Sequence, residues 1–252
     1  MKLGTTLLLI FKYLLFLLVV AYLGFALVRF VRPAEDLVCT GVKVELERDS
    51  VLSLVDEAYV LNLLGQHKIS PKGRSFKDID KEEINRLLDK SPHWDTAYCY
   101  RNSAAELVVC AKVVKPVLHV FTDGGEEFYL GQDGRVLPLT GHNPELCVAT
   151  GAITHAFAAR QLTPLANLIL ESDFWRLQVQ QIHVDSQGCI WLTTRLGEKE
   201  LLLGDASNLE DKLERLRLFF VKGLPKAGWN TYERVDASFD GQLVCVKRQQ
   251  TK

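Results

Sequence analysis

A long apolar segment lies at the start of the chain. From Leu3 to Val28 the one charged residue is Lys12, and the 16 residues from Tyr13 to Val28 carry no charge. As a helix those residues extend about 24 Å, whereas a bilayer core needs about 30 Å, so a span must begin before Lys12. A lysine near one end of a span can reach the headgroups. The segment therefore predicts a transmembrane signal anchor over residues 7–31 behind a cytoplasmic head, residues 1–12.

Two alternatives to an anchor fit this segment less well. A cleaved signal peptide has an apolar region of about 7–15 residues and a small-residue cleavage site. Here the run is longer, and Arg29 and Arg32 follow it directly. A buried core helix would show a polar face, and none is present. Because basic residues flank the span on both sides, the positive-inside rule does not orient it. The shortness of the head places everything after Arg32 outside the cytoplasm.

The composition of the 252 residues excludes some classes of partner. The net charge is −1, so no global basic field is available to hold nucleic acid. The six cysteines form no C-x-x-C pair, which argues against a zinc site, and their apolar neighbours indicate small buried hydrophobic residues. An oxidising compartment would also permit disulfides, which the spacing does not pair. They are Cys39, Cys99, Cys110, Cys147, Cys189 and Cys245.

A first folded module is predicted over residues 38–115. Alternation predicts a strand over 38–47. A helix capped at Asp49-Ser50 and closed by Gly65 follows, and then a second helix capped by Asp80. Residues 94–101 and 105–115 form a hairpin around Asn102-Ser103. The order strand, helix, helix, strand, strand is α+β, with the helices on one side of a small sheet.

A second, β-rich module is predicted over residues 116–248. A hairpin turn at Gln132-Asp133-Gly134 joins short strands, and residues 151–171 are mostly helical with a break at Thr163-Pro164. Three strands follow, separated by turns at 185–188 and Gly197-Glu198. A helix is predicted from Asn208 to Gly223, because Leu209, Leu213, Leu216 and Phe220 recur at core spacing. The last strands are 232–238 and 242–247, joined at Asp240-Gly241.

No catalytic, cofactor or metal site emerges from the sequence, which contains no nucleophile elbow, zinc-protease motif, phosphate loop or dinucleotide fingerprint. The histidines are scattered, and His119 and His183 lie within strand patterns. The acidic run from Asp78 to Glu83 fits the start of a helix, and residues 123–127 fit a solvated turn better than a calcium loop. Phe174-Trp175 fits core or interface packing better than ligand stacking. The chain is therefore predicted to be a binding module that catalyses nothing and takes no small-molecule substrate.

Several short stretches, in order, resemble the FtsQ/DivIB family of bacterial division proteins, especially those of the Bacteroidetes branch. The family has a short cytoplasmic head, one membrane helix, a POTRA-like domain and a β-rich domain, and the resemblance covers nearly the whole chain. The stretches that carry it are Val113–Pro116, Phe128–Pro138, Phe174-Trp175, Gln181-Ile182, Leu203-Gly204, Lys212-Leu213, Gly228–Tyr232 and Val235–Val244.

The resemblance implies a non-catalytic membrane scaffold of the divisome. Such proteins bind small coiled-coil membrane proteins resembling FtsB and FtsL at the division site of the inner membrane, and help regulate septal peptidoglycan synthesis. Their last strand is the main docking edge, with an aromatic residue before it. The family commonly has an arginine where this chain has Ser238, which leaves a charge-paired contact there open. The implied partner-binding residues are Phe239, Gln242, Leu243, Val244, Cys245, Val246, Lys247 and Arg248.

The chemistry of a terminal strand favours the same role. An apolar final strand presents unpaired N–H and C=O groups, which a partner strand can satisfy. Lys247 and Arg248 could also simply protect this edge from wrong pairing. Two other functions stay open. One is a membrane-anchored envelope hydrolase, which needs a pocket of convergent carboxylates or histidines. The other is a POTRA-type chaperone, which is disfavoured because the chain has one POTRA-like unit and a dissimilar C-terminal domain.

Overall fold

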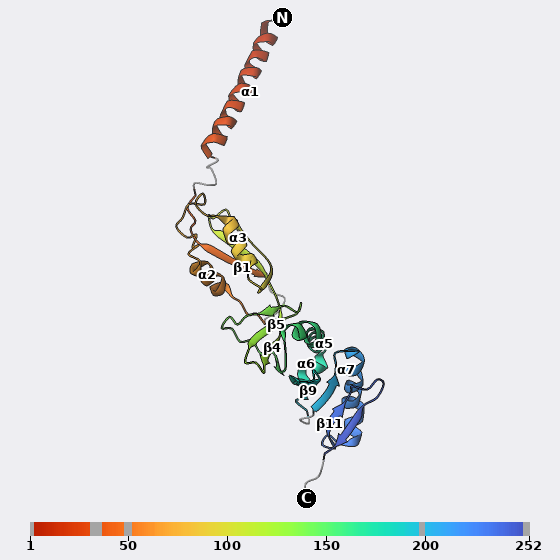
Figure 1. The fold of residues 1–252 in the computed structure, drawn as a ribbon. Coiled ribbons are helices and arrows are strands. Elements are labelled where there is room, and N and C mark those ends of the chain that lie inside the picture. The colour runs from red at the N-terminus through yellow and green to blue at the C-terminus, as the bar shows by residue number, and fades with distance from the viewer. Residues whose placement is uncertain (1–2, 31–36, 48–51, 197–199, 249–252) are drawn as a thin grey trace.

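The computed structural model describes residues 3–30, 37–47, 52–196 and 200–248, with side chains in the first helix over 11–26. That helix, α1, spans Leu3–Phe30 (Figure 1). Over the described residues, no helix has both the length and the apolar character needed to cross a membrane. The flanking residues 31–36 lie outside the described part of the chain, as do the predicted cap at Asp49-Ser50 and the predicted turn at Gly197-Glu198.

The N-terminal domain is a three-stranded sheet with two helices on one face (Figure 1). Its strand order is β1-β3-β2, with β1 parallel and β2 antiparallel to β3. The predicted order of strand, helix, helix, strand, strand is confirmed. The elements are β1 (Val42–Glu47), α2 (Glu57–Gln66), α3 (Lys81–Asp89), β2 (Trp94–Arg101) and β3 (Leu107–Val113).

Local caps explain where the two helices begin. Asp80 accepts a hydrogen bond from the Glu83 N–H at 2.9 Å, so the predicted cap of α3 is confirmed. The other helix of this domain, α2, begins later than predicted, because Asp56 caps it by accepting a hydrogen bond from the Tyr59 N–H at 2.8 Å. Leu52 and Val55 therefore precede α2, and Val55 is buried at the junction between the domains instead.

The C-terminal domain is built on one nine-stranded mixed sheet, in the order β12-β11-β10-β9-β8-β7-β4-β5-β6. The pairs β4–β7, β7–β8 and β10–β11 are parallel, and the other neighbours are antiparallel. The strands are β4 (Pro116–Thr122), β5 (Glu127–Gly131), β6 (Val136–Leu137), β7 (Cys147–Gly151), β8 (Val179–Val184), β9 (Ile190–Thr194), β10 (Glu200–Gly204), β11 (Tyr232–Asp236) and β12 (Val244–Lys247).

Helices cover one face of this sheet and enclose the main core. Leucines, isoleucines and valines of the strands pack there against helical residues such as Leu165, Trp175, Leu213 and Phe220, all buried. The helical segments are α4 (His155–Phe157), the π-helical turn η2 (Ala158–Leu162), α5 (Thr163–Glu171), α6 (Asp173–Gln178), α7 (Leu209–Leu218), the π-helical turn η3 (Phe219–Gly223) and α8 (Leu224–Ala227).

Two predicted helix boundaries in this domain are wrong, and a third is right although its side-chain cap is not made. The helix does not break at Thr163-Pro164, because the wide turn η2 precedes the proline and the buried Thr163 hydroxyl donates to the Ala158 carbonyl at 3.2 Å. The predicted start of α7 at Asn208 is confirmed, but Asn208 adopts the left-handed conformation and makes no side-chain cap. Helical structure also continues past Gly223 through η3 and α8, and ends before Gly228, which has a φ of 94°.

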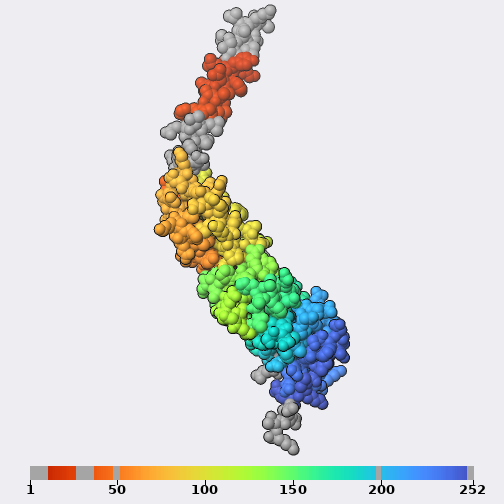
Figure 2. All heavy atoms as spheres, in the orientation of Figure 1, coloured from red at the N-terminus to blue at the C-terminus, as the bar shows by residue number. Residues whose placement is uncertain are grey.

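The two domains lie end to end (Figure 2). Side chains of both domains pack together where they meet. Val55 and Val113 of the first domain pack with Tyr129 and Leu137 of the second in one buried cluster. Arg135 reaches back from the β5–β6 turn, donating to the Trp94 carbonyl at 3.0 Å and pairing with Asp95 at 2.8 Å. Separate cores within 38–115 and 116–248 are thus joined by apolar and polar contacts, while the independent folding of each part stays a prediction.

No disulfide joins any two of the six cysteines, all of which belong to the described residues. Cys39 and Cys99 are buried, and the other four are half-buried. Two therefore behave as the small buried hydrophobic residues predicted from their neighbours, and the others lie nearer the surface.

Candidate partner-binding edge

The last strand, β12, lies at one end of the nine-stranded sheet, and β11 is its neighbour there (Figure 1). The register places Asp236 opposite Val244, Val235 opposite Cys245 and Arg234 opposite Val246. Among the described residues no other strand pairs with β12. The sheet therefore ends in an open edge formed by the strand that the sequence singled out.

Hydrogen bonds beside β12 show which backbone groups face the open side. The Arg248 N–H donates to the Thr231 carbonyl at 3.0 Å, and the N–H of Ala237, which directly follows β11, donates to the Leu202 carbonyl on β10 at 2.8 Å. Because backbone groups alternate along a strand, those of Val244 and Val246 face β11. The N–H and C=O groups of Cys245 and Lys247 consequently point to the open edge.

The side chains of β12 divide between the two faces of the sheet. Leu243 and Cys245 are half-buried and pack against the main core. Val244 lies on the opposite face with 44% of its surface exposed, and Val246 is half-buried. Of the other predicted residues, Gln242, Lys247 and Arg248 are exposed. The edge thus offers apolar surface next to two basic groups.

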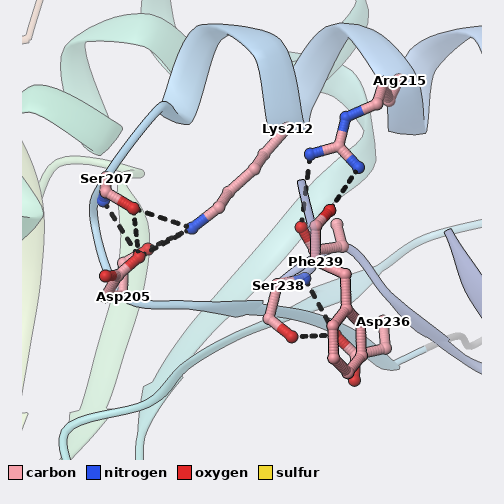
Figure 3. A network of polar contacts seen from close by, with 8 residues as sticks. Asp205, Ser207, Lys212, Arg215, Asp236, Ser238 and Phe239 are labelled. Atoms are coloured by element: carbon pink, nitrogen blue, oxygen red, sulfur yellow. Dashed lines mark hydrogen bonds and ion pairs between the residues drawn. The ribbon is translucent and has the colours of Figure 1, made fainter. Parts of the chain in front are cut away.

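Phe239 lies in the turn that leads into β12, and 48% of its surface is exposed. Arg215 of α7 holds this turn from behind (Figure 3). Its guanidinium donates to the carbonyls of Phe239 at 2.9 Å, Gln242 at 2.5 Å and Ala237 at 3.4 Å. Asp211, one helical turn earlier, orients it through a 2.8 Å ion pair. One helical side chain therefore fixes the backbone that presents the aromatic residue.

A second polar cluster anchors the start of α7 to the end of β10 (Figure 3). The Lys212 side chain is 2% exposed, and its ammonium contacts the carboxylate of Asp205 at 2.8 Å and the backbone carbonyl of Asp205 at 3.0 Å. The lysine and hydrogen bonds from Ser207 hold the pKa of the Asp205 carboxyl down, at about 2. Since the lysine is buried among apolar residues, this contact compensates its charge.

Ser238 occupies the position where the family commonly has arginine. Its hydroxyl donates to the Asp236 carboxylate at 2.6 Å, and the backbone N–H does so at 2.9 Å (Figure 3). A Cβ added at Gly204 would lie 2.9 Å from the Ser238 Cβ, so the two residues approach closely. An arginine is still present at this turn, but it comes from α7 as Arg215.

Sequence reasoning did not identify Arg215 as part of the site. Its spacing of four residues from Asp211 marks an ordinary ion pair on a helix face. The contacts with Phe239 and Gln242 span 24 and 27 residues, and only the folded chain brings them together. Lys212 belonged to one of the stretches that resemble the family, but its burial was not predicted.

The residues weighed for catalysis are engaged in local contacts. His119 lies 2.8 Å from the Glu127 carboxylate and stacks on Tyr129, with ring centroids 4.3 Å apart. His183 hydrogen-bonds Thr150 at 3.1 Å. Phe174 and Trp175 pack edge to face beside the core. In the part of the chain that the structure describes, no three or more potential metal ligands gather.

Comparison with protein-family models gives two matches. Residues 37–112 match a POTRA-like domain, and residues 115–246 match the model described as FtsQ/DivIB, C-terminal related. No curated protein matches the chain. The two matched ranges correspond to the two domains of the structure, and the second covers more than half of the 252 residues. The chain therefore belongs to the FtsQ/DivIB family of bacterial cell-division proteins.

Proposed function

We propose that this chain is a non-catalytic scaffold of the bacterial divisome, anchored in the inner membrane at the division site. It binds small coiled-coil membrane proteins resembling FtsB and FtsL, and through them helps regulate septal peptidoglycan synthesis. The observation that carries this proposal is the open β12 edge, next to the exposed Phe239, in a chain of the FtsQ/DivIB family.

The geometry of β12 supports recognition by an added strand. The N–H and C=O groups of Lys247 are directed outward, and a partner strand satisfies such groups through main-chain hydrogen bonds. Val244 then offers apolar contact, and Lys247 and Arg248 favour an acidic partner residue. An exposed edge of this kind invites aggregation unless it is covered or guarded, so a bound partner stabilises it.

The membrane anchor is proposed from the sequence. The run from Tyr13 to Val28 is uncharged, and α1 extends on both sides of it, over Leu3–Phe30. The uncharged run itself extends about 24 Å at 1.5 Å per residue, so residues on either side of it would complete a bilayer core of about 30 Å. Residues from Val38 onward then lie in the periplasm, within reach of other anchored division proteins.

The alternative of an anchored hydrolase has less support. Such an enzyme needs convergent carboxylates, histidines or a nucleophile in a cleft. His119 and His183 each hydrogen-bond one local side chain, on neighbouring parts of a sheet face. A POTRA-type chaperone is disfavoured by the large C-terminal domain, which matches the FtsQ/DivIB model.

To test the proposal, the full chain is isolated from its own cells by affinity capture and reconstituted in lipid nanodiscs. We expect mass spectrometry to recover small single-pass proteins with heptad repeats. We also expect a peptide that matches the membrane-distal end of such a partner to compete for them. Recovery of the chain without any coiled-coil membrane protein, at lipid and salt conditions that preserve its fold, contradicts the scaffold assignment.

A further inference from the structure

The α2–α3 loop, which connects those two helices, is bonded to the residues that follow α1. The Cys39 N–H donates to the Arg74 carbonyl at 2.8 Å. The Phe76 N–H donates to the Leu37 carbonyl at 3.0 Å. From the last residue of α1 to Leu37, a fully extended chain covers at most about 25 Å, at about 3.6 Å per residue. The loop, residues 67–79, is therefore held near the end of α1.

This loop lies at the pole of the N-terminal domain that is opposite the C-terminal domain (Figure 1). β1 begins at Val42, shortly after the residues to which the loop is bonded, and runs towards Leu46. Leu46 packs against the buried cluster at the junction between the domains. Because a strand is extended, its two ends lie far apart in the domain. With α1 anchored in the membrane as proposed above, the loop faces the bilayer.

The loop carries four basic side chains, and no acidic residue lies between positions 66 and 77. The four are Lys68, Lys72, Arg74 and Lys77, and all are exposed. Within the described part of the chain, no ion pair or hydrogen bond engages any of these four side chains. Their charges are therefore available to an anion outside the chain.

A tight turn presents two of these groups. The Arg74 N–H donates to the Pro71 carbonyl at 3.1 Å, and Gly73 between them has a φ of 81°, which favours glycine. Pro71 is buried, whereas Lys72 and Arg74 are exposed. The turn consequently directs two basic side chains outward from the pole.

Acidic groups that follow the loop are compensated within the domain. Asp80 caps α3 by accepting from the Glu83 N–H at 2.9 Å, and its carboxylate lies 3.9 Å from the Arg86 guanidinium. Glu82 and Glu83 occupy the first turn of α3, where the positive end of the helix dipole stabilises them. These carboxylates therefore do not cancel the charges of the loop.

The remaining charges near this pole leave an excess of positive charge. Arg101, over the Phe76 ring at 5.7 Å, offsets Glu106 of the same hairpin. Residues 29–36 of the sequence contain two basic and two acidic residues. Asp78 is exposed, and it stands against the four basic groups of the loop.

The loop lacks the apolar anchors that dominate protein interfaces. Its apolar members Ile69, Pro71 and Phe76 are buried or half-buried, and its exposed side chains are polar or basic. A layer of anionic groups suits such a surface better than a folded protein does. Clusters of four or more basic residues beside a membrane helix attract anionic lipids in this way.

We propose that the α2–α3 loop binds the anionic headgroups of the bilayer in which α1 is anchored. This inference rests on the proposed anchor, which brings the basic pole to the membrane surface. The contact limits how far the N-terminal domain can tilt away from the bilayer. Because the domains are joined by packed side chains, it also restricts the direction in which the β12 edge points.

Lysine reactivity in the full chain, reconstituted in lipid nanodiscs, tests the contact. One set of nanodiscs holds phosphatidylcholine alone, and the other also holds phosphatidylglycerol. Acetylation by an N-hydroxysuccinimide ester, read by mass spectrometry, gives a rate for each lysine. With phosphatidylglycerol we expect Lys68, Lys72 and Lys77 to react at least about threefold more slowly. The difference should vanish in about 1 M NaCl, where the Debye length is about 3 Å. Lys226 of α8 should react equally in both lipids.

Two double variants separate the loop from general charge effects. Lys72→Glu with Arg74→Glu should abolish the lipid-dependent slowing at the two remaining lysines of the loop. Lys222→Glu with Lys226→Glu makes a matched change at exposed residues of η3 and α8 and should preserve it. An equal loss of the effect in both double variants overturns the proposal.

Co-elution of the chain with the nanodiscs reports the anchor separately. If the chain co-elutes with both kinds of nanodisc and its loop lysines react equally in the two lipids, the headgroup contact is overturned while the anchor stands. If those lysines slow equally in both lipids only after cell extract is added, the loop binds an acidic protein instead, and the proposal is again wrong. A chain that co-elutes with neither kind of nanodisc overturns the anchor and this contact together.

Discussion

The guanidinium of Arg215 donates to the backbone carbonyl of Phe239 at 2.9 Å, across 24 residues of sequence. This contact ties α7 to the turn that begins the docking edge. Because the same side chain also reaches Gln242, both ends of the turn depend on one helical residue. Arg215 is therefore a positioning residue for the proposed interface, and it need not contact the partner.

Arg215→Gln should loosen this turn and weaken the domain. Hydrogen bonds from a charged group contribute about 1.5–3 kcal/mol, so we expect the free energy of unfolding to fall by about that amount. Urea denaturation measures the loss, and hydrogen exchange should accelerate at the amides between Phe239 and Leu243. Arg217→Gln removes an exposed ion pair with Glu214 and should lower the free energy of unfolding much less. Equal losses in the two variants contradict the positioning role.

Phe239→Ala should weaken binding of the FtsB-like partner. An exposed aromatic anchor typically contributes about 2 kcal/mol or more, which corresponds to a loss of roughly thirtyfold in affinity. Biolayer interferometry with the nanodisc-embedded chain provides the affinity, and circular dichroism checks the fold. Tyr98→Ala removes an exposed aromatic residue of the N-terminal domain and serves as the matched control. A folded Phe239→Ala protein that binds at wild-type strength excludes this anchor.

The backbone of β12 can be tested separately from its side chains. Lys247→Pro deletes an N–H that faces the open edge, so it should reduce partner affinity about fivefold or more while the domain stays folded. Lys247→Gln controls for the lost charge. Val246→Pro deletes an N–H directed at β11 and should instead destabilise the domain. If Lys247→Pro and Lys247→Gln bind alike, the partner does not add a strand here.

The sequence predicted most elements of the fold because its patterns are local. Alternation and side-chain caps located β1, α3 and β2, and the turns after β5 and β8 have the glycines that their geometry needs. Prediction was wrong where a tertiary contact decides the outcome. Val55 is buried between the domains and Asp56 caps α2 after it, and Thr163 continues a helix that Pro164 was expected to interrupt.

The candidate site was predictable only in part, for the same reason. A final apolar strand is visible in the pattern from Gln242 onward, but the direction of each N–H depends on its register with β11. Arg215 and Lys212 lie on α7, and their contacts with Phe239 and Asp205 depend on how that helix packs across the sheet. No local pattern records that packing.

Acidification should weaken the junction between the domains through His93. Burial lowers the pKa of this imidazole from its ordinary value of 6.5 to about 4, and its Nε2 donates to the Pro138 carbonyl at 3.1 Å. Because the folded pKa is depressed, the stabilisation is complete above pH 6.5 and is lost as the pH falls towards 4. It amounts to at most about 3 kcal/mol. Thermal unfolding between pH 7 and 4 should show this loss, and His93→Gln should reduce it. The exchange His67→Gln, at an exposed histidine just after α2, controls for the substitution itself.

The orientation of the anchor can be read by thiol labelling at the tip of a loop. Gly125 has a φ of 81°, which strains any other residue, whereas a Cβ at Gly124 meets only Thr122 Oγ1 at 3.7 Å. Gly124→Cys should therefore preserve the fold and expose a thiol. If residues from Val38 onward are periplasmic, a maleimide that cannot cross membranes should label this cysteine in intact spheroplasts. The wild-type chain sets the background from its six native thiols. Lys2→Cys should be labelled only after the cells are lysed, because its position before α1 places it in the cytoplasm. Labelling of Lys2→Cys in intact spheroplasts, with Gly124→Cys protected until lysis, reverses the topology and with it the periplasmic location of the docking edge.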